Sequence, residues 1–146
     1  MVTQADTRYI DTEFAARLRL AITRTARRLR QTAGSDLGPS QLAALATIER
    51  HGPLAPSELA ERERIKRPTA TRVLGHLEDA GLVGRVRDPS DGRSSILSIT
   101  AEGRALLGRL RARKTAYLAD HLRELDPADV AALERAADVL ERMLDD

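Results

Sequence analysis

Apolar residues recur along most of the chain at the 3.6-residue spacing of amphipathic helices. The first such segment spans residues 12–32, where Asp11 or Thr12 can cap a helix. Its apolar positions are Phe14, Leu18, Ile22 and Leu29. A second helix is expected from Pro39, a residue that suits the first helical position, to the break at residues 51–53.

Two shorter helices are expected next, separated by a tight turn. The first starts near residue 56, and the second has Pro68 in its first turn and Gly81 as its C-terminal cap. Residues 82–87 and 95–100 then read as two short strands, because the segment between them is rich in Asp, Pro, Ser and Gly.

Two long helices are expected after this hairpin. Thr100 can cap the first, which runs to about residue 125, and Pro127 restarts the chain as the second. The apolar positions of the last helix have heptad-like spacing and are Val130, Leu133, Ala137, Leu140 and Leu144. Such seams are too apolar to stay exposed, and we expect them to pack on each other and on a second copy of the chain.

The order of these elements predicts a mainly α fold with a small β-hairpin wing. Residues 34–100 would form a winged helix-turn-helix, a DNA-binding domain. Residues 1–33 and 101–146 would form a helical dimerisation region.

Composition excludes several classes of function. The chain has no cysteine, which removes disulfides, thiolate metal sites and thiol redox sensing. No apolar run approaches ~18 residues, and the polar start lacks a secretory signal, so we expect a cytoplasmic protein. The three histidines have no metal-ligand spacing, and no phosphate-binding loop or nucleophile motif is present. We therefore expect no metal, no cofactor and no enzyme.

Charge is distributed unevenly along the sequence. Residues 62–72 carry five positive side chains against one acid, whereas residues 120–146 carry nine acids against three arginines. The middle of the chain can therefore face a phosphate backbone and the tail cannot. The exposed first turns of the fourth helix, with Arg67, Thr71 and Arg72, fit the major groove, and a hairpin tip with Arg93 suits an adjacent minor groove.

Four motifs in combination resemble the multiple antibiotic resistance regulator (MarR) family. They are residues 56–61 (PSELAE), 67–72 (RPTATR), 77–83 (LEDAGLV) and 88–93 (DPSDGR). The resemblance implies a homodimeric transcriptional regulator, expected to be a repressor, with recognition helices in the major grooves of a palindromic operator and wings at the minor grooves. It also implies release of DNA by a small aromatic or phenolic compound bound between the DNA-binding and dimerisation parts.

The sequence departs from the family pattern at the turn before the recognition helix. Glu63 and Arg64 stand where a Leu-Gly pair is usual, and Lys66 stands where a capping Ser or Thr is common. Arg64 lacks the conformational freedom of glycine, and Lys66 cannot accept the free amide hydrogens of the helix. Both changes add positive charge near the expected DNA backbone.

Individual residues of this region can be given roles in DNA binding. Thr69, Thr71 and Arg72 are candidates for base edges, and ordinary helix surface is the alternative. Asp91 matches an Asp-x-Arg pattern of the family and would orient an arginine, because phosphate would repel a free carboxylate. Arg85 and Arg87 share one face of a strand. One or both could contact phosphates, or this face could be exposed to solvent without touching DNA. The full set of candidates is Lys66, Arg67, Pro68, Thr69, Thr71, Arg72, His76, Arg85, Arg87, Asp91 and Arg93.

A ligand pocket near the domain junction is a further expectation. Its candidate lining is Tyr9, Phe14, Arg17, His51 and Tyr117, for which core or dimer packing is the alternative. Two other functions stay open. The chain could be an effector-independent or architectural DNA-binding protein, which its scarcity of aromatic residues favours, or a helical module that binds another protein.

Overall fold

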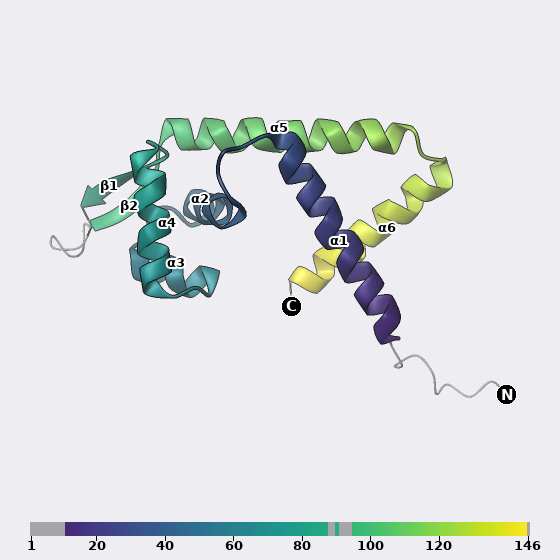
Figure 1. Cartoon of the computed structure of the whole chain (residues 1–146), viewed down its shortest axis with the longest axis horizontal. Helices are drawn as coiled ribbons and strands as arrows, with labels where there is room; N and C mark the ends of the chain where they lie inside the picture. Colours follow the sequence, from purple (N-terminus) through teal and green to yellow (C-terminus); the bar gives the residue numbers. More distant parts are fainter. Residues whose placement is uncertain (1–10, 88–89, 91–94, 146) are drawn as a thin grey trace. The chain divides into compact units, whose positions relative to one another are not determined.

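The structure is a computed structural model, and it describes residues 11–87, 90 and 95–145. Within them the chain forms six helices and one antiparallel hairpin (Figure 1), as the sequence predicts. In chain order these elements are α1 (Thr12–Ala33), α2 (Pro39–His51), α3 (Pro56–Glu63), α4 (Arg67–Asp79), β1 (Val83–Arg87), β2 (Ser95–Ile99), α5 (Ala101–Arg123) and α6 (Pro127–Leu144).

Local chemistry at the element ends accounts for these boundaries. The backbone N–H of Glu13 donates to the Asp11 carboxylate over 2.9 Å, which caps α1. The N–H of Gly103 donates to the Thr100 hydroxyl over 3.1 Å, so Thr100 caps α5 as expected. Gly81 follows α4 with a φ of +76°, a left-handed conformation that glycine adopts without steric cost.

Residues 34–112 make one compact unit with a single hydrophobic core. Its most buried side chains come from three helices and the hairpin and are Leu45, Ile48, Leu59, Leu77 and Leu97. The two strands pair with Arg85 opposite Leu97, and Leu54 bridges to the other side of Leu97 through two backbone hydrogen bonds of 2.8 and 2.9 Å. The part of the hairpin that contains Leu97 is therefore held against the core.

The start of α5 lies unusually close to this hairpin. A Cβ atom on Gly103 would stand 2.3 Å from the backbone oxygen of Leu82 and 2.7 Å from Cγ1 of Ile99. The Thr100 hydroxyl also donates to the carbonyl of Gly81 over 2.7 Å. These contacts fix the wing against the end of α4, and only glycine fits at position 103.

The described residues up to Ala33 and those from Arg113 onward make a second, helical unit. Within it, α1 buries only Ala33 and α6 buries no residue. Large apolar side chains stand open to solvent, among them Phe14 (55% exposed), Leu133 (48%) and Met143 (63%). Because helices in proteins are stabilised mainly by packing of an apolar face, one copy of the chain leaves this unit without a core.

Candidate nucleic-acid interface

Helix α4 carries the predicted base-reading residues and has one buried and one open side. Ala70, Val73, Leu74 and Leu77 are buried in the core. Arg67, Thr71 and Arg72 are exposed, whereas Thr69 is half-buried. Pro68 is the second residue of the helix, where a missing N–H is tolerated. The first two turns of α4 thus present short donors and guanidinium groups outward.

A hollow of about 510 Å³ lies between α4 and the beginning of α2. Arg72 and His76 line it from α4, Ser40 and Gln41 line it from α2, and Asp36 lines it from the loop before α2. The free backbone N–H groups and the dipole of a helix N-terminus favour an anion, and the positive charge of Arg72 offsets the negative charge of Asp36. Sequence reasoning named Arg72 and His76 as DNA-binding candidates but missed Ser40, although Pro39 already signalled a helix N-terminus.

A second hollow of about 410 Å³ lies beside the first turn of α4. It is lined by Arg67 and Thr71 from α4, by Ser95 of the hairpin and by the start of α3, including Ser57. None of the described residues that line it is acidic. Hydroxyl and guanidinium groups arranged in this way can hold a phosphate. Ser57 and Ser95 were missed because neither belongs to the basic stretch of residues 62–72.

Arg85 has a partner inside the protein. Strand pairing places Arg85 opposite the buried Leu97, so its side chain lies on the core-facing side of the hairpin. There its Nε donates to the Glu78 carboxylate, near the end of α4, over 2.7 Å. This ion pair joins the wing to the recognition helix. Arg85 and Arg87 are both exposed, and Asp91 and Arg93 lie outside the described residues.

The turn from α3 to α4 has the unusual backbone that the sequence departures suggested. Arg64 adopts a left-handed conformation with a φ of +54°, where glycine is usual. Lys66 occupies the N-cap of α4 and makes no side-chain capping bond. Glu63, the last residue of α3, instead accepts a hydrogen bond from the Thr47 hydroxyl of α2.

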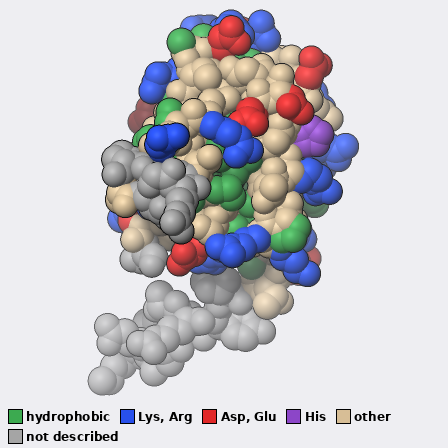
Figure 2. Space-filling model, turned by 90° about the vertical axis from the view of Figure 1, so that its left-hand side faces the viewer, with side chains coloured by type: hydrophobic (Ala, Val, Ile, Leu, Met, Phe, Trp, Pro, Cys, Tyr) green, Lys and Arg blue, Asp and Glu red, His purple; other side chains and the backbone are tan. Residues whose placement is uncertain are grey.

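Positive side chains are spread over the part of the molecule that carries α3, α4 and the hairpin. Figure 2 faces this part and shows Lys and Arg side chains at several places on the surface, with acidic ones between them. Lys66 and Arg67 are exposed at the start of α4. The surface is therefore suited to hold DNA at separate phosphate contacts rather than through one continuous basic patch.

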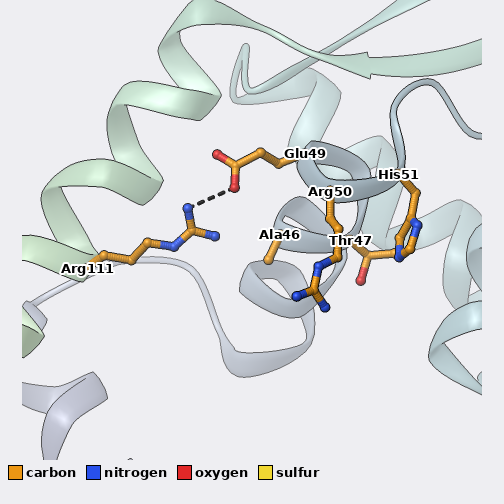
Figure 3. A pocket seen from close by; sticks show the side chains of 6 residues that line it. All are labelled: Ala46, Thr47, Glu49, Arg50, His51 and Arg111. Carbon is orange, nitrogen blue, oxygen red and sulfur yellow. Dashed lines mark hydrogen bonds and ion pairs between the residues drawn. The ribbon is translucent and has the colours of Figure 1, made fainter. Parts of the chain in front are cut away.

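The structure places two of the predicted ligand residues at hollows. His51 lines one of about 550 Å³, in which Arg111 forms an ion pair of 2.8 Å with Glu49 (Figure 3). Its remaining lining is Ala46, Thr47 and Arg50. Tyr117 lines another of about 320 Å³ in the helical unit, and its ring lies against that of His121 in a tilted arrangement with centroids 4.3 Å apart.

The other predicted ligand residues are placed differently. Phe14 and Arg17 are exposed on α1 and line neither of these two hollows, and Tyr9 lies outside the described residues. Among the described residues, no three His, Asp or Glu side chains group closely enough to hold a metal ion. No described helix has the length and apolarity needed to cross a membrane.

Comparison with known proteins identifies the family. The sequence pattern of the MarR family matches residues 37–95. An HTH-type transcriptional regulator of Mycobacterium tuberculosis is 36% identical over 137 residues, which cover 93% of this chain and 96% of the relative.

Solved structures agree in fold. A Pseudomonas aeruginosa protein shares 34% identity and superimposes with a TM-score of 0.82, covering 93% of this chain and 97% of its own. FabT of Streptococcus pneumoniae was solved in complex with DNA. It superimposes with a TM-score of 0.68 over 92% of this chain and 98% of its own, and at 19% identity the likeness concerns the fold alone. Since the mycobacterial relative matches along almost the whole of both chains, this protein belongs to the MarR family of HTH-type transcriptional regulators.

Proposed function

We propose that the protein binds double-stranded DNA as a homodimer, reads a palindromic operator with α4 and represses transcription there. The observation that carries this proposal is the open side of α4, flanked by two hollows that are each lined by an arginine and by at least one serine. An α-helix fits the major groove, and hollows on its flanks would receive phosphates at the groove edges. The DNA complex of FabT, which shares this fold, supports the same use of it.

The roles of the α4 residues follow from where each side chain lies. Thr71 is exposed one turn into the helix and faces a base edge in this arrangement. Lys66 and Arg67, at the start of the helix, bind the phosphate backbone of the DNA. Arg72 lines the hollow at the N-terminus of α2, so it either reads a guanine or holds a phosphate beside Ser40. His76 lines the same hollow and contacts the DNA backbone.

The wing would act at the neighbouring minor groove. Arg85 holds the wing against α4 through Glu78, which leaves Arg87 as the strand residue free to approach phosphate. At the tip, Arg93 would enter the groove and Asp91 would orient it. A narrow minor groove attracts arginine through its strong negative potential.

Pairing of two chains is supported by the helical unit, whose apolar side chains are exposed in a single copy. The exposed apolar residues of α1 and α6 need a cover, and the two helices have opposite charge: α1 has six arginines between residues 17 and 30, and residues 120–146 are acidic. A second copy offers both an apolar seam and complementary charge. It also supplies the second recognition helix that a palindrome requires.

Release by a small molecule is the regulatory part of the proposal. The hollows at His51 and Tyr117, of about 550 and 320 Å³, are in the range that small ligands occupy, roughly 300–1,000 Å³. Arg50, beside the Arg111–Glu49 pair in the first hollow, and Arg24 and Arg28 in the second favour an anionic compound, such as a phenolate or an aromatic carboxylate. An effector-independent DNA-binding protein remains the alternative, and a thermal-shift screen of such compounds separates the two.

Selection of duplexes from a random library tests the proposal. The wild-type protein should enrich one palindromic sequence whose half-sites are about one helical turn, 34–36 Å, apart. Binding to that duplex should weaken as salt rises. Recovery of no consensus, together with no salt-dependent mobility shift on any duplex, would favour the protein-binding module instead.

A further inference from the structure

The turn that aims the recognition helix lacks the two local devices that usually stabilise such a turn. Arg64 takes the left-handed position of a helix C-terminus, where a Cβ atom is unfavourable. Its backbone still closes the motif, with the N–H of Ile65 donating to the carbonyl of Ala60 over 3.0 Å. Lys66 then begins α4 without a side-chain cap. Contacts with other elements can therefore add to this backbone bond in holding the turn.

A hydrogen bond joins the end of α3 to helix α2, which buries Leu45 and Ile48 in the core. The Thr47 hydroxyl donates a hydrogen bond to the Glu63 carboxylate, immediately before Arg64. Thr47 stands on α2 between the fully buried Leu45 and Ile48, so its backbone is held by the core. A hydrogen bond to a charged acceptor in a half-buried setting is stronger than one between neutral groups. Thr47 and Glu63 thus tie the end of α3 to a rigid support.

We propose that the Thr47–Glu63 hydrogen bond positions the recognition helix for base readout, in place of the glycine and the N-cap that this turn lacks. Thr47 and Glu63 are positioning residues in this scheme, because they act on DNA only through the placement of α4. The inference rests on the proposed DNA-binding function. It implies that loss of the bond harms recognition of sequence more than general affinity for DNA, because base contacts need a closely defined geometry and phosphate contacts tolerate small shifts.

Thr47→Val tests this scheme, because valine has nearly the shape of threonine without its hydroxyl. On the duplex selected by the wild-type protein, Thr47→Val should bind roughly tenfold more weakly, the loss expected for one charge-assisted hydrogen bond. On an unrelated duplex the change should stay under about twofold. Thr47→Ser keeps the hydroxyl and should bind both duplexes like the wild type. Equal weakening on both duplexes, or a lower unfolding temperature with unchanged binding, would overturn the proposal.

A second set of variants tests whether the bond compensates for Arg64. In the Thr47→Val background, Arg64→Gly removes the strain of a left-handed residue that carries a Cβ atom. Arg64→Ala removes the same charge but keeps the Cβ atom and its strain. In this background, the protein with Arg64→Gly should bind the selected duplex about fivefold more tightly than the protein with Arg64→Ala. This gain lies within the roughly tenfold loss assigned to the hydrogen bond. If the Gly and Ala variants bind alike, backbone strain at Arg64 is not what the bond offsets, and the proposal fails.

Amide hydrogen exchange gives a test that needs no DNA. The N–H of Ala70 donates to the carbonyl of Lys66 over 3.0 Å and reports on the first turn of α4. Thr47→Val should raise its exchange rate roughly tenfold relative to the wild type, and Thr47→Ser should not. Unchanged exchange would reject the positioning role. Faster exchange in a protein that selects no duplex would instead reject the proposed DNA-binding function and leave the mechanical role of the bond standing.

Discussion

Two glycines of α5 should respond in opposite ways to the same substitution. Gly103 faces the hairpin, where an added Cβ would meet the Leu82 carbonyl oxygen at 2.3 Å and a side-chain carbon of Ile99 at 2.7 Å. Gly108, a turn and a half further along, has nothing within 4 Å of an added Cβ. Alanine should therefore clash at position 103 and be accommodated at position 108.

The size of the effect follows from two opposing contributions. Overpacking a close contact costs about 1–3 kcal/mol, and the upper value applies here because a backbone oxygen cannot rotate away. Alanine gains up to about 1 kcal/mol over glycine in a helix. We expect Gly103→Ala to lower the free energy of unfolding by about 2 kcal/mol and Gly108→Ala to raise it by about 0.5–1 kcal/mol, by the same balance of terms.

Thermal unfolding followed by circular dichroism at one protein concentration measures both variants. With roughly 2–4 °C of melting temperature per kcal/mol, Gly103→Ala should melt about 4–8 °C below the wild type and Gly108→Ala slightly above it. If Gly103→Ala is as stable as Gly108→Ala, the start of α5 does not pack against the hairpin as described. The fixed attachment of the wing would then be wrong as well.

Three predictions concern DNA binding directly. If each chain neutralises about four phosphates, the logarithm of affinity should fall with the logarithm of salt concentration at a slope of roughly −7, and a slope shallower than about −3 would refute the grip assigned to Lys66, Arg67 and the wing. Replacing Leu133 and Leu140 together by Asp should give monomers or unfolded chains in analytical ultracentrifugation and abolish specific binding, so a folded monomer with full operator affinity would contradict the dimer. Arg72→Ala should cost about 1–3 kcal/mol on the selected duplex and relax one base preference per half-site, whereas a common loss on all duplexes would make Arg72 a phosphate contact.

The element boundaries were predictable because they are set by neighbouring residues. Thr100 caps α5 and Gly81 follows α4 in a left-handed conformation through bonds and angles within a few positions of each. The role of Arg85 was not predictable in this way. Alternation in the strand indicated a shared face with Arg87, but not that this face points to the core or that Glu78 lies within reach.

The anchoring of the α3–α4 turn was equally hidden from sequence reasoning. Thr47 and Glu63 are sixteen residues apart, and no periodicity links them. The sequence showed that glycine and a cap were missing from the turn, which was correct, but a substitute can come only from tertiary packing. That Arg72 of α4 lies beside the N-terminus of α2 depended in the same way on tertiary packing.

The nearly coreless helical unit has a consequence for how the protein responds to its own abundance. If a second copy completes that core, folding of the helical ends and association are one equilibrium, and dilution acts on them as a denaturant does. Below the dissociation constant, the amount of paired protein varies with the square of the number of chains. Operator occupancy would then respond more than proportionally to synthesis and degradation of the regulator, without any ligand.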